Sequence, residues 1–338
     1  MNATGARATS RVAVTRVLGG ERRPRERDLV AAEEPMEIRL LAGSGRAAGF
    51  VPGTRADPVS APRTPSNRGD ARRDAVGVAA ATGAGKLTVA VTMRTPGRDF
   101  ELAAGFLFSE GILHSRDEIH SLHYCLDESE PERHNIVNVV LRSASLPAVE
   151  RLERHFTMSS ACGVCGKAHL EALEVRCPAP GGAGPRITAA VLETLPEKLR
   201  SSQALFGRTG GLHAAGLFTA TGELLAVRED VGRHNALDKL IGWALLEDRL
   251  PLDELVICVS GRASFELLQK CVVAGARVFA AVSAPSSLAV DVAERFGVTL
   301  VGFLRDERFN VYTGGERVTS GTQARRARAG IGGALESR

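Results

Sequence analysis

The sequence is short of aromatic residues, of long apolar runs and of cysteines, and each shortage excludes a class of protein. No apolar run approaches the roughly 18 to 20 residues that a membrane-spanning helix needs. Near the N-terminus, the arginines from Arg7 to Arg27 interrupt every apolar stretch, which is not typical of a secretory signal. The six cysteines are too scattered to predict a disulfide framework. We therefore expect a cytoplasmic protein with reduced thiols and no membrane partner.

Aromatic residues make up only 4% of the 338 residues, and this shortage bears on nucleic-acid binding. The net charge of +4 comes from three Arg-rich segments, because arginines outnumber acidic residues in 1–35, in 42–75 and in 320–338. Basic segments can bind nucleic acid, but no aromatic side chains alternate with these arginines to stack on bases. Solvated disorder is the simpler interpretation. We expect residues 1–35 and 319–338 to be basic disordered tails, with no nucleic-acid partner.

Residues 36–186 predict a smaller N-terminal α+β part. Met36–Leu41 alternates weakly between apolar and polar residues and is expected to be an edge strand. Residues 43–86 are rich in Gly, Ala, Arg, Pro and Ser, which predicts a flexible insertion. A strand is expected over Leu87–Met93, and Asp99 is expected to cap the helix that follows it.

Residues 187–318 predict a C-terminal α/β part. A hairpin and a helix over 235–246 are followed by three uniformly apolar strands that alternate with amphipathic helices. This order predicts right-handed βαβ units and a mostly parallel sheet covered by helices on both faces. The strands are expected at 255–260, 277–283 and 298–303, and the helices at 265–274 and 286–296.

Cys162 and Cys165 are the most informative residues of the chain. They lie two residues apart in the run Ser-Ser-Ala-Cys-Gly-Val-Cys-Gly-Lys at 159–167. Small neighbours leave both sulfurs uncovered, and Lys167 favours the thiolate over the thiol. A thiolate in such a turn can take the outer sulfur of a partner's persulfide and pass it on. The pattern therefore predicts a sulfur carrier with Cys162 and Cys165 as its reacting residues.

Two other interpretations of this turn stay open. Cys162, Cys165, His169 and Cys177 offer four zinc ligands for a zinc-stabilised binding module, although the later spacings differ from those of a zinc knuckle. A thiol–disulfide oxidoreductase of the thioredoxin type has a similar Cys-Gly-x-Cys motif, although the residues before it here are too polar for a central strand. A zinc deaminase is excluded, because His213 lacks the Glu two positions later that this reaction needs.

A polar loop follows each of the three apolar strands, at Ser260–Arg262, Ser283–Ser287 and Phe303–Arg308. Open α/β sheets bind ligands at the carboxyl ends of their parallel strands. Hydroxyl groups and free backbone N–H groups at helix starts suit phosphate, although Ser and Pro at these positions also serve as simple caps. Taken together, the three loops predict a large phosphate-bearing ligand at this edge.

The segment Asp230–Lys239 concentrates charged residues around a turn that enters a helix. Arg233 and His234 are expected to contact an anion at the helix start. The simpler interpretation is that Asp230 caps the helix and that the last two residues form a solvated face. Both interpretations stay open at this point.

Many ordered motifs together resemble the formate dehydrogenase accessory sulfurtransferases, the FdhD/NarQ family. The resemblance covers about residues 87–318. The motifs are Met93-Arg94-Thr95-Pro96-Gly97, Phe106 to Gly111, the cysteine turn, Gly211-Leu212-His213-Ala214-Ala215, Asp230 to Lys239, Ser260-Gly261-Arg262 with Phe265-Glu266, and Gly302-Phe303-Leu304-Arg305.

The resemblance implies a cytidine-deaminase-like three-layer fold and a homodimer. It also implies that Cys162 accepts persulfide sulfur from a cysteine desulfurase, with help from Cys165. The sulfur would then go to the molybdenum or tungsten of a bis-molybdopterin guanine dinucleotide cofactor, bound as a substrate rather than as a permanent cofactor, for use by formate dehydrogenase. The family's cofactor-binding segment falls on Phe303, Leu304, Arg305, Asp306, Glu307 and Arg308, and no metal ligand is implied.

Overall fold

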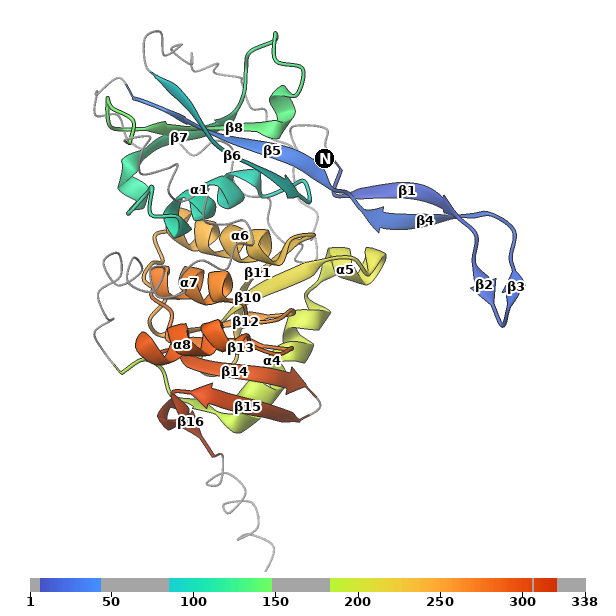
Figure 1. Ribbon diagram of the computed structural model, residues 1–338, viewed down its shortest axis with the longest axis vertical. Helices are drawn as coiled ribbons and strands as arrows, with labels where there is room; N and C mark the ends of the chain where they lie inside the picture. Colours follow the sequence, from blue (N-terminus) through green and yellow to red (C-terminus); the bar gives the residue numbers. More distant parts are fainter. Residues whose placement is uncertain (1–6, 44–84, 148–182, 306, 321–338) are drawn as a thin grey trace, which may run out of the picture.

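The computed structural model describes residues 7–43, 85–147, 183–305 and 307–320. Figure 1 shows these residues as a stack in which a small sheet, two contacting helices and a larger sheet follow one another. Most of the insertion predicted at 43–86, the cysteine turn with His169 and Cys177, residue 306 and the tail from residue 321 lie outside the described residues. Within the described ranges, no helix is both long and apolar enough to cross a membrane.

The larger sheet has six strands in the order β11-β10-β12-β13-β14-β15. Its centre is the three apolar strands predicted from the sequence, and β12, β13 and β14 are parallel to one another. The outer strands pair antiparallel, so the complete sheet is mixed. The strands are β10 (His213–Thr219), β11 (Leu224–Asp230), β12 (Leu255–Val259), β13 (Val278–Ala281), β14 (Thr299–Arg305) and β15 (Arg308–Thr313).

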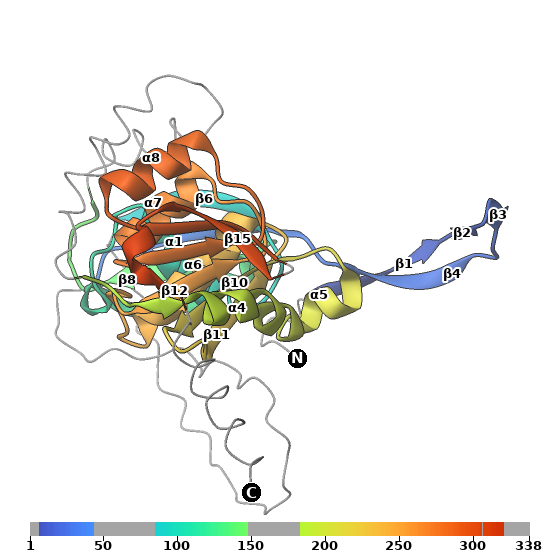
Figure 2. The ribbon, with the colours of Figure 1, turned by 90° about the horizontal axis from the view of Figure 1, so that it is seen from below.

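Helices cover both faces of this sheet, which confirms the α/β class and its three layers (Figure 2). Alternate residues of β12 explain this arrangement: Ile257 packs into the core on the side of α6–α8, whereas Val256 and Cys258 pack toward α4. Cys258 and Cys271 are fully buried, and burial raises the pKa of both thiols, so both are core residues. The helices are α4 (Ala189–Ser201), α5 (Ala204–Thr209), α6 (Arg233–Leu246), α7 (Phe265–Val273) and α8 (Ser287–Arg295).

The smaller sheet has the strand order β6-β5-β8-β7, and its apolar face covers α1. The strand predicted at Met36–Leu41 is β5, and it lies between β6 and β8, so the prediction of an edge strand is wrong. Met36, Ile38 and Leu40 are all fully buried, as an inner strand requires. The elements of this part are β5 (Glu34–Leu41), β6 (Lys86–Arg94), α1 (Asp99–Ser109), β7 (Ile119–Tyr124), β8 (Ile136–Leu141) and the short 3-10 turns Arg116–Glu118 and Arg133–Asn135.

Residues 9–31 form an ordered ribbon where the composition predicts a disordered tail. β1 (Thr9–Val14) and β4 (Glu26–Ala31) pair antiparallel along their whole length, and β2 (Val17–Leu18) pairs with β3 (Glu21–Arg22) at the far end. Gly19 and Gly20 both have positive φ and reverse the chain between β2 and β3. The ribbon projects away from the body (Figure 1). The prediction of disorder is therefore wrong for these residues.

Two short strands close the C-terminal part. β9 (Ile187–Thr188) pairs parallel with β16 (Val318–Thr319), which follows the turn Gly315–Arg317. The beginning of this part therefore lies beside its end. The division of the chain between residues 186 and 187 stays a prediction.

Helices α1 and α6 join the two parts of the stack through backbone contact. A Cβ atom at Gly105 would lie 1.9 Å from the carbonyl oxygen of Asp238, and one at Gly242 would lie 1.8 Å from that of Glu101. Both distances are far below contact, so only glycine fits at either position. Ion pairs border the crossing, since the Asp238 carboxylate accepts from Ser109 (3.0 Å) and pairs with Lys270 (2.9 Å).

We expect Gly105→Ala to destabilise the protein because the added methyl group must push α1 and α6 apart. Overpacking of this kind typically costs about 1–3 kcal/mol, and a backbone clash belongs at the upper end. Urea unfolding of the variant and the wild type measures the loss. Gly207→Ala is the matched control, because a Cβ at Gly207 meets nothing within 4 Å in helix α5. Equal stability of Gly105→Ala and wild type would contradict the close crossing.

Candidate functional site

The carboxyl edge of the larger sheet carries the candidate site. We call three segments at this edge the rim: Ser260–Ser264, Val282–Ser286 and Phe303–Arg308. Residue 306 of the third segment lies outside the described residues. They follow the parallel strands β12, β13 and β14, whose carboxyl ends meet at one edge. The structure therefore brings together the three polar loops that the sequence singled out.

Backbone hydrogen bonds join the three rim segments into one surface. Ser283 N donates to Gly261 O (3.2 Å), and Phe303 N donates to Ser283 O (3.1 Å). Ala263 N donates to Ala284 O (3.2 Å), and the return bond from Ser286 N to Ala263 O is 2.9 Å. A ligand that binds one rim segment is thus held by a surface whose parts cannot move independently.

Three helix N-termini point their positive ends to this edge. α7 and α8 start directly after the first and second rim segments, and α6 starts after β11, which runs in the same direction as β12. Helix starts of this kind attract anions. One backbone donor at the start of α8 is already used, however, because Ala289 N donates to Ser286 Oγ (3.3 Å). Ala214 N donates to Ser260 Oγ (2.9 Å), and both serine hydroxyls keep their own hydrogen to donate. The simple capping interpretation is therefore correct for Ser286.

Arginines give the rim a positive charge. Arg262, Arg305 and Arg308 are exposed, and none of them forms an ion pair with a carboxylate of a described residue. Arg233 starts α6 at the same edge, and its Nε is buried without a hydrogen-bond partner among the described residues. Planar guanidinium groups bind phosphate oxygens in pairs, so the rim suits a polyanionic ligand.

Strained backbone marks the segment that the family resemblance assigns to cofactor binding. Phe303 and Glu307 have φ values of 53° and 58°, a region that favours glycine. The segment is less of a loop than predicted, because β14 continues to Arg305 and Arg308 already begins β15. Phe303 is nevertheless 37% exposed although it is a large apolar residue. Strain and exposure together are typical of residues that contact a ligand.

Two histidines extend the rim. His213 begins β10 beside Gly261, since a Cβ atom at Gly261 would lie 3.4 Å from its Nδ1. Burial lowers the pKa of His213, and the charges of Arg233 and His234 lower it further, so the ring is neutral near pH 7. His234 Nε2 lies 3.4 Å from Ser264 Oγ and 3.8 Å from the Glu266 carboxylate.

The Glu266 carboxylate is held in its ionised form. Its polar contact with His234 is the largest cause of a pKa lowered to about 2. Sequence reasoning placed His213 and Glu266 within family motifs but gave them no role. The position of His213 at the start of a strand that pairs with β12 is the feature that places it on the rim.

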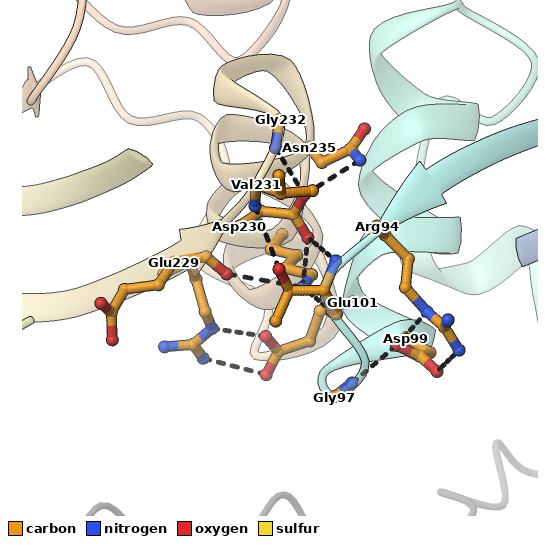
Figure 3. A network of polar contacts seen from close by, with 12 residues as sticks. Arg94, Gly97, Asp99, Glu101, Glu229, Asp230, Val231, Gly232 and Asn235 are labelled. Atoms are coloured by element: carbon orange, nitrogen blue, oxygen red, sulfur yellow. Dashed lines mark hydrogen bonds and ion pairs between the residues drawn. The ribbon is translucent and has the colours of Figure 1, made fainter. Parts of the chain in front are cut away.

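A buried network fixes the start of α6 against the loop between β6 and α1 (Figure 3). Asp230 is fully buried and pairs with Lys239 (2.6 Å), which is 2% exposed. Thr95 N and Gly232 N donate to the same carboxylate (3.1 and 2.8 Å), and Lys239 Nζ also donates to Thr95 O (2.8 Å). The solvated face predicted for Asp238 and Lys239 is therefore wrong, because both side chains are buried ions.

Further ion pairs flank this network. The Arg228 guanidinium binds both oxygens of Glu101 on α1, and Arg94 binds Asp99 (2.9 Å). Asp99 also accepts from Gly97 N (3.0 Å), so its carboxylate organises the loop before α1. Arg98 occupies the cap position, and Asp99 is the first residue of the helix, not its cap as predicted.

Several of the predicted site residues cannot be placed. Cys162, Cys165 and Asp306 lie outside the described residues, as do the other two candidate zinc ligands, His169 and Cys177. Among the residues that the structure does describe, no group of His, Cys, Asp and Glu side chains is arranged to hold a metal ion. The described part of the site is therefore the positively charged rim.

Comparisons with known proteins agree on one family. The model of the FdhD/NarQ family matches residues 81–319. A protein named sulfur carrier protein FdhD from Mycolicibacterium paratuberculosis is 54% identical over 237 residues, which are 69% of this chain and 87% of the relative. The protein of the same name from Nocardia farcinica is 52% identical over 240 residues, 70% of this chain and 84% of the relative.

One solved structure has the same fold. It is a candidate formate dehydrogenase accessory protein from Desulfotalea psychrophila, with a TM-score of 0.62 and 23% sequence identity. The match covers 92% of this chain and all of the other one.

We expect Lys239→Met to destabilise the protein strongly, because Asp230 would stay buried without its cation. Breaking a buried ion pair on one side costs about 3–5 kcal/mol. Denaturant unfolding measures this loss. The double variant Asp230→Asn with Lys239→Met removes both charges and should recover part of it. A loss below about 1 kcal/mol in the single variant would contradict the role of the pair.

His213 should make stability depend on pH below neutrality. Its folded pKa is lowered from the ordinary 6.5, so the unfolded chain binds the proton more readily. The free energy of unfolding should therefore be highest above about pH 6.5 and fall as the pH decreases from there through the folded pKa. In His213→Gln this part of the decrease should vanish. Unfolding curves of both proteins between pH 5 and pH 8 provide the comparison, and parallel profiles would show that the burial of His213 has no such effect.

Proposed function

Because this chain belongs to the FdhD/NarQ family, we propose that it carries sulfur for the maturation of formate dehydrogenase. The observation that carries this proposal is the identity of about half of all aligned residues with proteins named sulfur carriers. The family match spans 81–319 and so includes both the cysteine turn and the rim. A carrier needs a reactive sulfur and a surface for the recipient of the sulfur, and these two segments supply candidates for both.

The proposed first step takes place on Cys162. Its thiolate attacks the outer sulfur of a persulfide on a cysteine desulfurase, the S–S bond of the donor breaks, and the donor's own sulfur leaves as a thiolate. Cys162 then carries the transferred sulfur as a persulfide. The step needs no external oxidant or reductant, because one persulfide is consumed for each one formed.

The proposed second step uses Cys165. Its thiolate attacks the inner sulfur of the Cys162 persulfide, so that the two cysteines form a disulfide and the outer sulfur leaves as hydrosulfide. The two cysteine thiols supply the two electrons of this reduction, and a dithiol reductant must restore them before the next cycle. The hydrosulfide is delivered to the metal of a bis-molybdopterin guanine dinucleotide, which is the substrate.

The rim is the proposed site for this substrate. Its pyrophosphate groups carry negative charges that fit Arg262, Arg305 and Arg308, and the helix N-termini add a favourable potential. The strained backbone at Phe303 and Glu307 supports the assignment of Phe303–Arg308, with Leu304 and Asp306 between them, as the segment that contacts the cofactor. A homodimer in the cytoplasm, with a cysteine desulfurase as donor and formate dehydrogenase as recipient, completes the proposal.

We expect a cysteine desulfurase with L-cysteine to add one sulfur atom to the wild-type chain and none to Cys162→Ala. Intact-mass spectra before and after treatment with a thiol reductant measure the added sulfur. Cys125→Ala is the matched control, since it removes a buried thiol outside the turn and should leave the loading unchanged. Expression in cells that lack their own accessory protein gives the second readout, in which the wild type restores formate dehydrogenase activity and Cys162→Ala does not.

Other results would favour the alternatives for the cysteine turn. Zinc bound in equal amount to the protein, and lost in Cys165→Ser, would indicate a zinc-stabilised module. Reduction of insulin without any loading of sulfur would indicate a thiol–disulfide oxidoreductase. Either result would contradict the sulfur-carrier proposal.

A further inference from the structure

A hollow of about 670 Å³ lies where the N-terminal ribbon meets the body of the protein. Its walls come from the root of the ribbon, from the entry to β5 and from helix α5. The ribbon diagrams show these three segments near one another (Figures 1 and 2). At the root of the ribbon Ala32 N donates to Ala8 O (2.9 Å), which joins its two ends. Helix α5 is held against the sheet, because Leu205 N and Phe206 N donate to the Glu229 carboxylate (3.0 and 2.8 Å). The hollow is thus formed by segments with defined positions.

Three arginines line this hollow, and their charges are not compensated nearby. Arg7 and Arg11 come from the ribbon and Arg208 comes from α5. Within the described ranges, none of the three forms an ion pair with a carboxylate. Among the described residues of the lining, Glu34 is the only acidic one, and its carboxylate lies 3.6 Å from the guanidinium of the fully buried Arg94. The hollow therefore has an excess of positive charge that a bound anion would offset.

The shape and chemistry of the hollow select one class of anion. Its volume lies within the range of about 300–1,000 Å³ that is typical of small-molecule sites. Guanidinium groups bind phosphate oxygens in pairs, and the hydroxyl of Thr9 can donate to a further oxygen. Leu29 and Ala32 add an apolar wall for a base or a ribose. Three arginines around one hollow suit a compact phosphate group better than an extended acidic peptide, whose carboxylates would need charges spaced along a groove.

We propose that this hollow is a second anion site, which binds the phosphate groups of a ligand of nucleotide size. It is separate from the rim, although a Cβ atom added at Gly211, two residues before His213, would lie 3.9 Å from the Cβ of Ala31 at the root of the ribbon. All of its lining residues except Arg208 precede residue 81, where the family match begins. The site therefore lies mostly outside the matched range and does not depend on the sulfur-carrier proposal.

Calorimetric titration of the full-length protein with ADP and with pyrophosphate tests the site. Both probes should bind saturably, whereas adenosine, which lacks phosphate, should not. Arg11→Gln with Arg208→Gln should weaken binding about tenfold or more, because each change removes a two-pronged contact. Arg208→Lys keeps the charge but loses the planar guanidinium group, so its affinity should lie between that of the double variant and that of the wild type. Arg22→Gln is the matched control on the same ribbon outside the hollow and should stay within about twofold of the wild type.

Binding at the rim is distinguished by a second set of variants. Arg262→Gln with Arg305→Gln and Arg308→Gln should leave the hollow's binding event intact. Loss of all binding in this rim variant, with none in Arg11→Gln/Arg208→Gln, would overturn the proposal. So would an equal loss in Arg22→Gln, which would indicate nonspecific attraction to a basic ribbon, or tight binding of a polyglutamate peptide without any binding of ADP or pyrophosphate.

Discussion

One buried carboxylate holds the functional edge of the molecule together. Asp230 is removed from water at the end of β11, and its oxygens are shared among Lys239, two backbone N–H groups and the amide of Asn235. A buried charge costs several kcal/mol unless every partner is in place. The partners come from both parts of the stack, since Thr95 belongs to the loop after β6. The start of α6 is therefore positioned only when the two parts have assembled.

The rim combines features that do not favour stability. It has exposed arginines without carboxylate partners in the described part of the chain, backbone strain at Phe303 and Glu307, and a large apolar side chain in contact with solvent. Like charges repel and strained φ values cost energy, so the rest of the molecule must offset these terms. The close crossing of α1 and α6 and the apolar layers on both faces of the large sheet supply that stability. Such a division is typical of a rigid body that presents a ligand-binding edge.

Elements whose structure depends on neighbouring residues in the sequence could be predicted, whereas those that depend on distant residues could not. The strands β12–β14 and their helices were predicted almost residue by residue, because a strand buried on both faces must be uniformly apolar. The ribbon was missed because its arginines suggested disorder, whereas the Gly19-Gly20 pair between the segments Val17-Leu18 and Glu21-Arg22 is a hairpin signal. The burial of Lys239 could not be predicted, because besides the nearby Asp230 it depends on the loop at Thr95, which is far away in the sequence. The position of the rim could be predicted from the order of the strands, but the positive φ of Phe303 is visible only in the structure.

The parallel pair of β9 and β16 has a consequence for how the chain comes apart. Because Ile187 pairs with Val318, the chain between them is a long loop whose ends are joined by a strand pair of only two residues, which we call the seam. The entropic cost of closing a loop grows slowly with its length, so such a short seam suffices under resting conditions. Under mechanical tension or attack by a protease, a seam this small would open long before the central strands do. The C-terminal part should thus fray first where β9 pairs with β16.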